Sequence, residues 1–271
     1  MTRTEDWDSV GASTEKRNIA RYYDYLLGGY HNFAVDRMMG DLVIQACPDI
    51  RLGALANRAF LRRAVKFLCQ QGLDQFLDLG SGIPTSGNVH EVAQKINPAA
   101  HVFYVDIDPV AVIHSQAILK DNPNASTLQE DILNIEKILD HPAFTALIDL
   151  RRPLGVLMLS VLHFVKDDES LQGILRVLKN RLISGSYIVI SHYSVEGAPL
   201  ETITQLNRFG GGDSSKSTSR SIAETSRLFD GFELVEPGVV RLPLWRPENP
   251  DDLLVSQPER SMAFAGIGRQ P

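Results

Sequence analysis

From residue 72 to the end of the chain, short apolar runs alternate with segments of helical periodicity, and this alternation constrains the fold most strongly. A run that is apolar at nearly every position predicts a strand buried on both faces, as in a parallel sheet covered by helices on either side. The pattern therefore predicts a doubly wound α/β domain. The expected strands cover residues 75–79, 101–105, 125–128, 154–159, 187–191, 232–240 and 263–268. The expected helices between them cover residues 88–96, 109–121, 132–139, 168–181, 200–208 and 221–229.

The part of the chain before residue 72 has the pattern of helices throughout. Apolar side chains recur at helical spacing over residues 14–27, 34–46 and 52–70. No linker rich in proline and glycine follows these helices, so we expect them to bury their apolar sides against the α/β domain. We therefore divide the chain into an N-terminal helical extension, residues 1–71, and an α/β domain, residues 72–271.

Composition narrows the class of protein and its compartment. The chain has 271 residues, a net charge of −6 and two cysteines, Cys47 and Cys69. No run reaches the roughly 20 apolar residues of a membrane span, and the polar N-terminus lacks the apolar segment of a secretory signal. The acidic balance disfavours a nucleic-acid partner, and the cysteines and histidines lack the spacing of a metal site. These features predict a cytoplasmic protein with no metal and with neither a membrane nor a nucleic acid as partner.

A glycine-containing turn, in the sequence FLDLGSGIPTSGNVH, joins an expected strand to an expected helix through Gly80, Ser81 and Gly82. Glycine is needed where φ is positive or where a ligand approaches the backbone closely. The next helix presents free N–H groups, so the segment is typical of nucleotide binding. A dinucleotide fingerprint would have a third glycine where Thr85 stands, and would not place Asp78 beside a diphosphate. Both points disfavour NAD, whereas Asp78 suits a ligand with a cationic amino group.

Acidic residues also follow the second and third expected strands. Asp106, with Ile107 after it, stands where a carboxylate can accept both hydroxyl groups of a ribose, a feature that fits NAD and S-adenosylmethionine (SAM) equally. Asp131, before Ile132, can accept a hydrogen bond from an adenine amino group. Because open α/β folds bind ligands at the carboxyl ends of their parallel strands, these acids predict one nucleotide site.

Polar residues follow the fourth and fifth expected strands as well. Ser160 and His163 come after the fourth, and His192 and Tyr193 come after the fifth, so all are expected beside the same crevice. His163 is a candidate base or acceptor contact, with a capping role in the next helix as the alternative. Residues 209–219, FGGGDSSKSTS, are of low complexity and predict a mobile loop at the margin of the site.

Taken in order, the motifs D-x-G-x-G, VDID-P, ED and SVLHF resemble the class I SAM-dependent methyltransferases. The segments RYYDYLLGGYHNFAVDR and DLGSGIPTSGNVHEVAQ resemble an actinobacterial SAM methyltransferase family whose acceptor is unknown. The resemblance extends from about Arg17 to Gly268 and departs from the wider class at Ile83-Pro84. It implies a Rossmann-like fold with a seven-stranded, mostly parallel sheet whose last strand is antiparallel, and it implies SAM as the cofactor.

The resemblance also implies which residues contact the cofactor. The glycine turn would lie against the amino-acid part of SAM, Asp106 would bind the ribose and Asp131 would lie near the adenine. The polar and aromatic N-terminal motif would form a lid over the site, although a capped helix with an Asp–Arg pair is the alternative. The expected cofactor contacts are Asp78, Gly80, Ser81, Gly82, Asp106, Ile107, Asp131, Ile132, Ser160, Tyr22 and Asn32.

Methyl transfer needs a general base only when the acceptor loses a proton before it attacks. His163 and His31 are the candidates for that role, on position and chemistry. The expected function is SAM-dependent methyl transfer to an unidentified small molecule. Two alternatives stay open at this point: a SAM-binding regulator without catalytic activity, and an NAD(P)-dependent oxidoreductase.

Overall fold

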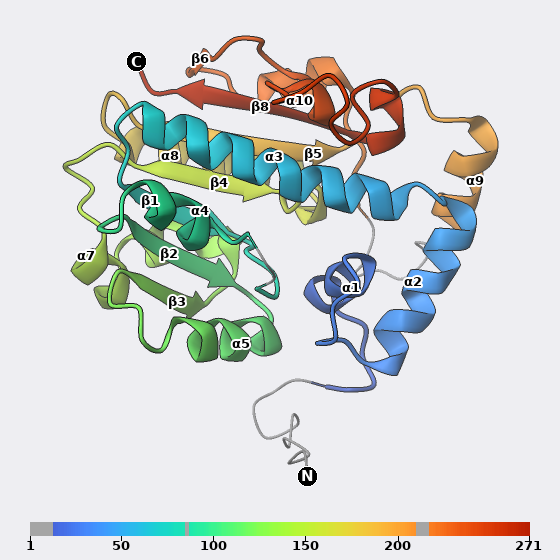
Figure 1. Ribbon diagram of the computed structural model, residues 1–271, viewed down its shortest axis with the longest axis horizontal. Helices are drawn as coiled ribbons and strands as arrows, with labels where there is room; N and C mark the ends of the chain where they lie inside the picture. The colour runs from blue at the N-terminus through green and yellow to red at the C-terminus, as the bar shows by residue number, and fades with distance from the viewer. Residues whose placement is uncertain (1–12, 85–86, 210–216) are drawn as a thin grey trace.

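An eight-stranded sheet runs through the described part of the chain, residues 13–84, 87–209 and 217–271 of the computed structural model (Figure 1). The strands are β1 Gln75–Leu79, β2 His101–Asp106, β3 Ala125–Gln129, β4 Gly155–Leu159, β5 Tyr187–Tyr193, β6 Glu233–Leu234, β7 Val240–Arg241 and β8 Ala263–Arg269. Their order is β3-β2-β1-β4-β5-β8-β6, with β7 also paired to β8. Strands β1 to β5 are parallel and β8 is antiparallel to β5, which confirms the predicted class of fold.

The strand predicted over residues 232–240 is two short strands, and for this reason the sheet has eight strands instead of seven. β6 pairs with the end of β8, whereas β7 pairs nearer its start. Between them, Pro237 has no N–H to donate and Gly238 has a φ of +83°. The chain therefore turns at this point and does not continue the ladder.

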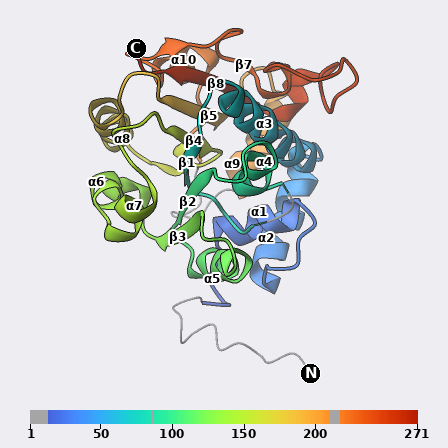
Figure 2. The ribbon, with the colours of Figure 1, turned by 60° about the vertical axis from the view of Figure 1, so that its left-hand side comes forward.

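Helices cover both faces of the sheet (Figure 2). One layer consists of α3 Ile50–Gln70, α4 Val89–Ile96 and α5 Pro109–Leu119, and the other of α6 Ile135–Leu139, α7 Pro142–Leu147, α8 Asp168–Arg181 and α10 Ile222–Arg227. Each layer closes an apolar core against the sheet, with Phe60 and Phe76 in the first and Phe103 and Phe144 in the second. Because both faces are buried, β1, β2, β4 and β5 are mostly apolar, as their sequences predicted, whereas β3 at the edge of the sheet is more polar and only partly buried.

Two helix predictions differ from the structure in this region. The segment over 132–139 begins as a 3₁₀ turn, Ile132–Asn134, and becomes α-helical only from Ile135. Helix α7 was not predicted, although His141-Pro142 is a typical helix start: proline needs no N–H at the first turn, and Nδ1 of His141 accepts the N–H of Ala143 at 3.2 Å.

Two further helices, α1 Ile19–Leu26 and α2 Ala34–Ala46, lie beyond the carboxyl ends of the parallel strands (Figure 1). The helix predicted from residue 14 begins at Ile19 because Asn18 caps it, with its Oδ1 accepting the N–H of Ala20 at 2.7 Å. Ala20 and Phe33 pack against an apolar cluster from the glycine turn and the start of α5. That cluster consists of Ile83, Val110 and Ala111.

Helix α9, Leu200–Phe209, contacts α2 on the outside of this extension. Most of the mobile loop predicted over residues 209–219 lies outside the described residues. Among the described helices, none combines the length and the apolar character needed to cross a membrane.

Candidate functional site

The glycine turn is bound by its backbone to the end of β2. The N–H groups of Gly80 and Ser81 both donate to the carbonyl oxygen of Val105, at 2.8 and 3.1 Å. Gly80 has a φ of +71° and Gly82 a φ of +68°, a region that favours glycine. A Cβ added at Gly80 would lie 2.3 Å from Cγ2 of Val161, whereas one added at Gly82 would meet no described atom within 4 Å. Gly80 therefore serves close packing onto the end of β4, and Gly82 borders open space.

Asp106 closes the turn from the β2 side. Its carboxylate accepts the N–H of Gly82 at 2.7 Å with one oxygen and the N–H of Asp108 at 2.9 Å with the other. Burial raises the pKa of Asp106 to about 6, against the lowering effect of these two hydrogen bonds. Each carboxylate oxygen has a second lone pair, so Asp106 can still accept the hydroxyl groups of a sugar. Ile107, which follows, is 60% exposed.

Asp131 stands at the start of the 3₁₀ turn after β3. Its Oδ1 accepts the N–H of Leu133 at 2.9 Å and so caps that turn, and the side chain is half-buried at the sheet edge. Ile132 turns the other way and packs in the core of the α6–α8 layer. Of the two residues predicted near an adenine, only Asp131 therefore keeps a polar group at the edge where Asp106 lies.

Ser160, directly after β4, has a φ of +52°, which is uncommon outside glycine. Its N–H donates to the carbonyl oxygen of Ser191 at 3.1 Å and to its Oγ at 2.9 Å. Oγ of Ser191 in turn donates to Asn57 at 2.7 Å, and the amide of Asn57 donates to the hydroxyl of Tyr23 at 3.0 Å. This chain of hydrogen bonds ties the end of β4 to β5, α3 and α1. Strained backbone held in this way is common at ligand sites.

The residues of the N-terminal motif lie on two sides of the site, one beside β2 and β3 and the other beside β5. Asn32 is buried, and its amide donates to Asp24 at 2.8 Å and to the carbonyl oxygen of Gly29 at 2.9 Å, so it holds the turn between α1 and α2. His31 is exposed, and its ring lies 3.9 Å from that of His114 on α5, beside β2 and β3. The structure therefore places His31 on the side of the site formed by β2 and β3.

Tyr22 and His163 lie on the other side, near β5. Burial raises the pKa of Tyr22, and the nearby Cys47 and Tyr193 raise it further. His163 is 7% exposed, and its ring centre lies 5.9 Å from that of Tyr193 and 5.6 Å from that of His192. The two candidate bases, His31 and His163, are thus not neighbours, and His163 is the one beside β4 and β5.

Sequence reasoning missed Arg58, which lies on α3 next to the glycine turn. It lines a pocket with Asp78, Ser81 and Tyr104, and its guanidinium donates to Asn88 at 3.1 Å. Burial raises the pKa of Asp78 to about 7, the positive charge of Arg58 opposes that rise, and the neighbouring Asp106 adds to it. The available signal was topological: α3 precedes β1 and runs antiparallel to it, so the first half of α3 returns to the carboxyl edge of the sheet.

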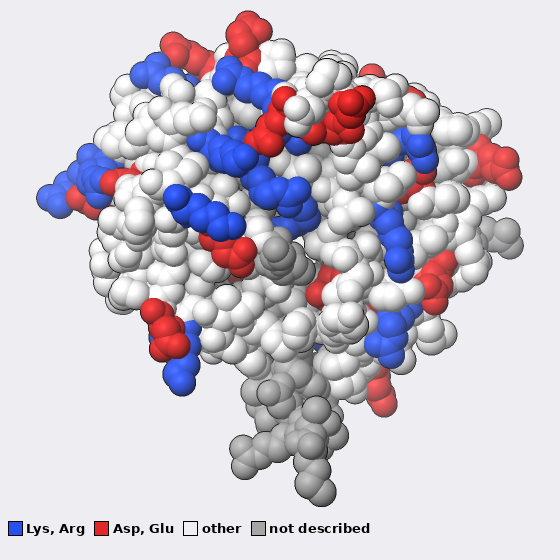
Figure 3. Space-filling view, in the orientation of Figure 1, with Lys and Arg blue, Asp and Glu red and all other residues white. Residues whose placement is uncertain are grey.

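Arg58 also belongs to a basic row along α3, which is visible in the middle of the face shown in Figure 3. This row and two acidic residues line an open groove on the outside of the helix. Lys66 pairs there with Glu248 at 2.6 Å. The basic residues of the row are Arg58, Arg62, Arg63 and Lys66.

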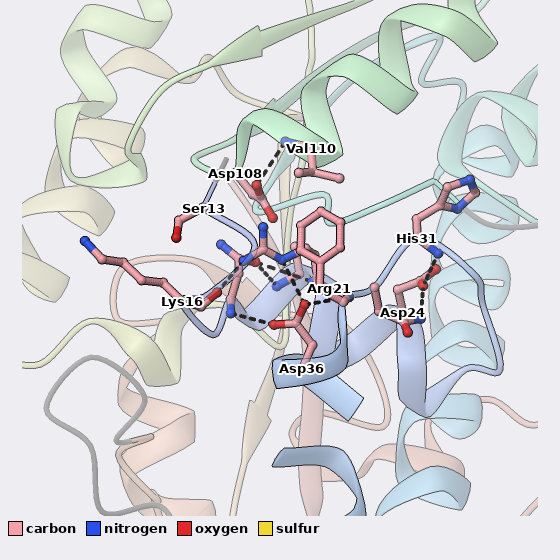
Figure 4. Close-up of polar contacts among 12 residues, drawn as sticks. Ser13, Lys16, Arg21, Asp24, His31, Asp36, Asp108 and Val110 are labelled. Carbon is pink, nitrogen blue, oxygen red and sulfur yellow. Dashed lines mark hydrogen bonds and ion pairs between the residues drawn. The ribbon is translucent and has the colours of Figure 1, made fainter. Parts of the chain in front are cut away.

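A buried charge cluster joins the N-terminal helices to the start of α5. The sequence offered an Asp–Arg pair in this motif as the alternative to a lid, but it gave no sign of the third member of the cluster, Asp108. Figure 4 shows Arg21 of α1 between Asp36 of α2 and Asp108, the residue that caps α5. Nε of Arg21 lies 3.0 Å from Oδ2 of Asp36, an ion pair that is not a hydrogen bond. Burial raises the pKa of Asp108, and the charge of Arg21 opposes this. All three side chains are nearly inaccessible, so the cluster fastens the extension to the segment that also carries Asp106.

The fold and the edge of the sheet together define the class of protein: an α/β enzyme fold with acids at the ends of successive strands and a helical cover. Comparison with known proteins agrees with this class. A solved structure of a candidate methyltransferase from Thermobifida fusca YX is 37% identical to this chain. The match covers 98% of this chain and 99% of the other, with a TM-score of 0.90. A DUF574 family protein from Streptomyces avermitilis is 36% identical over 95% of this chain and 99% of its own, with a TM-score of 0.88. A comparison with curated proteins gave no match.

The family model described as S-adenosyl methyltransferase matches residues 5–271, and the chain belongs to that family. It is therefore a SAM-dependent methyltransferase, as the sequence motifs predicted. The family also decides between the two nucleotides in favour of SAM over NAD(P). The described residues fit such a ligand, because a buried acid and a guanidinium flank one pocket and Ser81 has a buried hydroxyl there without a described partner.

The raised pKa of Asp78 predicts a pH dependence of SAM binding. The carboxyl is anionic above about pH 7 and becomes neutral below it, so an ammonium group of SAM placed beside it would lose this attraction as the pH falls. We expect the affinity for SAM to decrease by up to about tenfold per pH unit below this value. Titration calorimetry on both sides of pH 7 measures the effect. In Asp78→Asn, affinity should be lower and this part of the pH dependence should disappear; an unchanged pH profile in the variant would assign the effect to Asp106.

Proposed function

We propose that this protein transfers the methyl group of SAM to a small-molecule acceptor in the cytoplasm. In this proposal residues 72–271 supply most of the cofactor contacts, and residues 1–71 supply the lid over the site, α1 and α2, together with Arg58 of α3. The observation that carries it is the pocket between α3 and the glycine turn, where Asp78 and Arg58 present opposite charges to one small space. The amino-acid part of SAM is a zwitterion, and that pocket offers one partner for each of its charges.

Within the pocket, Asp78 pairs with the ammonium group and Arg58 with the carboxylate of the amino-acid part. Charge-assisted hydrogen bonds of this kind are the strongest that a protein forms to such groups. The hydroxyl of Ser81 supplies a further polar contact, and Gly82 lets the ligand approach the backbone. Gly80 contributes by holding the turn against β4.

The remaining contacts extend along the carboxyl edge of the sheet. Asp106 accepts the ribose hydroxyls, and the exposed Ile107 covers one side of the sugar and base. Asp131 accepts the amino group of the adenine, with Ile132 anchoring that segment in the core. Three more predicted residues lie on the side of the lid and of β4. Ser160 borders the cofactor with its strained backbone, and Tyr22 contacts the cofactor from the lid. Asn32 acts indirectly, by holding the turn between α1 and α2.

SAM supplies an activated methyl group on a sulfonium, and the protein has to align the acceptor with it in a dry site. The lid excludes water because its apolar residues Ala20 and Phe33 pack on Ile83 of the glycine turn. Alignment and exclusion of water account for a large part of the rate in transfers of this type. His163 lies on the acceptor side, beside β4 and β5.

The assignment of Arg58 is tested by comparing two ligands in titration calorimetry. SAM carries the amino-acid part, whereas 5′-methylthioadenosine lacks it. We expect Arg58→Ala to weaken SAM by about 1–3 kcal/mol and to leave 5′-methylthioadenosine unchanged, because the lost charge faces only the carboxylate. Asp106→Ala should weaken both ligands, since both contain the ribose.

Arg62→Ala is the matched control, because Arg62 lies one turn further along α3 and is exposed. It should bind both ligands as the parent does. If Arg58→Ala lost affinity equally for the two ligands, the role of Arg58 would be to stabilise the glycine turn and not to bind the carboxylate. SAM binding without formation of S-adenosylhomocysteine in the presence of any acceptor would favour the regulatory alternative.

A further inference from the structure

The ring of His163 has a polar atom that the fold does not satisfy. Its Nδ1 is buried and has no hydrogen-bond partner among the described residues, and the residue as a whole is 7% exposed. An unsatisfied buried polar group costs free energy, so such a group in a folded protein calls for an explanation. His163 follows β4, next to the strained Ser160, where the proposed acceptor would meet the cofactor. A polar atom of the acceptor is the partner that this position lacks.

The neighbouring histidine, His192, has hydrogen-bond partners within the protein for both of its ring nitrogens. Arg220 donates to Nε2 of His192 at 2.8 Å, so that nitrogen is an acceptor and the proton stands on Nδ1, which donates to the carbonyl oxygen of Tyr193 at 2.8 Å. Burial lowers the pKa of His192 to about 4. His192 is therefore a fixed neutral ring, and His163 is the imidazole of the pair that can exchange a proton with a ligand.

The charge around His163 selects among acceptors. Burial lowers its pKa well below the ordinary value, and His192 and Arg220 lower it further, while no described carboxylate acts on it. Arg220 itself pairs with Asp168 at 2.6 Å, and the side chain of Asp168 is 85% exposed. A protonated amine would meet a positive field here without a counter-ion. An oxygen that develops negative charge would be stabilised by the same field.

The walls of this position are aromatic. Phe164 lies with its ring centre 4.2 Å from that of His163, and Tyr193 lies 5.9 Å away on the other side. Tyr22 of the lid comes close enough to Tyr193 for the two to influence each other electrostatically. Flat apolar side chains around one polar atom suit an aromatic ring that carries a single polar group.

We propose that His163 binds the hydroxyl group of a neutral aromatic acceptor, so that the enzyme is an O-methyltransferase of phenol-type compounds. This inference rests on the proposed methyl transfer. The acceptor O–H bond breaks and its proton goes to His163, while the oxygen forms a bond to the methyl carbon and the carbon–sulfur bond breaks with its electron pair left on sulfur. The positive charge of the sulfonium thus ends on the imidazolium, and it leaves with the proton to solvent. Arg220 is a positioning residue that acts through His192.

The test uses 4-nitrophenol as a probe, because its phenolate has a visible absorption that its neutral form lacks. We titrate 4-nitrophenol into the full chain saturated with S-adenosylhomocysteine and follow the phenolate band against pH. The bound probe should ionise at lower pH than the free probe, because the charge of Arg220 stabilises its phenolate, and this should raise its phenolate fraction by about tenfold below its own pKa. His163→Gln should abolish this shift, because the ring that holds the probe oxygen in this field is then missing. His101→Gln, at the opposite edge of the sheet where β2 begins, should retain it.

Calorimetry with S-adenosylhomocysteine accompanies each protein, and failure of that binding in the parent would overturn the proposed function itself. With the cofactor site intact, a shift that persists in His163→Gln, or no binding of 4-nitrophenol, overturns the acceptor assignment. Labelled SAM with catechol or benzylamine gives the second measurement. Transfer to catechol that His163→Gln reduces supports the proposal, and transfer to benzylamine alone contradicts it.

Discussion

Gly82→Ala is expected to weaken SAM binding strongly while the protein remains folded. Gly80→Ala is expected mainly to lower the free energy of unfolding, with a smaller effect on SAM binding. The two glycines have nearly the same positive φ, so each substitution costs about 1–2 kcal/mol of backbone strain. At Gly80 the new methyl group also meets Cγ2 of Val161 at 2.3 Å, and overpacking adds about 1–3 kcal/mol. At Gly82 the methyl group enters the open space assigned to the ligand, which should reduce affinity on the order of tenfold, or about 1.4 kcal/mol.

Urea denaturation and calorimetry measure these two quantities on the same samples, and each variant is the control of the other. The free energy of unfolding should fall further in Gly80→Ala, and the affinity for SAM should fall further in Gly82→Ala once the folded fraction is taken into account. Equal affinities in Gly82→Ala and the parent would show that the ligand does not pass along this part of the turn.

Asp36→Ala should lower the free energy of unfolding by about 3–5 kcal/mol, because it leaves the guanidinium of Arg21 buried without its partner. The same carboxylate accepts the N–H groups of Asn18 and Phe33, each at 2.9 Å, so the residue that caps α1 and the residue before α2 each lose a hydrogen bond as well. Thermal and urea unfolding measure the loss. Hydrogen exchange should show that α1 and α2 open first, before the sheet.

Asp41→Ala provides the comparison on the same helix. Asp41 is exposed and accepts a hydrogen bond from the hydroxyl of Tyr25 at 2.6 Å, and surface contacts of this kind contribute little. Its free energy of unfolding should stay within about 1 kcal/mol of the parent. If Asp36→Ala were as stable as Asp41→Ala, the buried cluster would not be what fastens α1 and α2 to the rest of the protein.

The strands of the sheet were predictable because the burial of each strand follows from the residues of that strand alone. Runs that are mostly apolar predicted β1, β2 and β5 to within a residue or two, as expected for strands buried on both faces. The break between β6 and β7 was missed because Pro237 was read inside an apolar run, although proline cannot continue a ladder there.

The site was predictable only where it follows the strands. Asp78, Asp106 and Asp131 could be placed because the ends of parallel strands share an edge. Arg58 could not, because its contact with the glycine turn depends on how α3 returns over β1. The sequence also left His31 and His163 as equals, and only the packing of the turn after α1 separates them, by setting His31 against α5.

The order of strands in the sheet bears on how such a protein diversifies. The strands that carry most of the proposed cofactor contacts, β1 to β3, come from one continuous stretch of chain, and the strands that carry the proposed acceptor contacts, β4 and β5, come from the next. Drift or recombination within the second stretch can alter acceptor preference while the first is inherited intact. The two stretches meet where Gly80 packs closely against Val161. A substitution at either residue therefore affects both the cofactor side and the acceptor side.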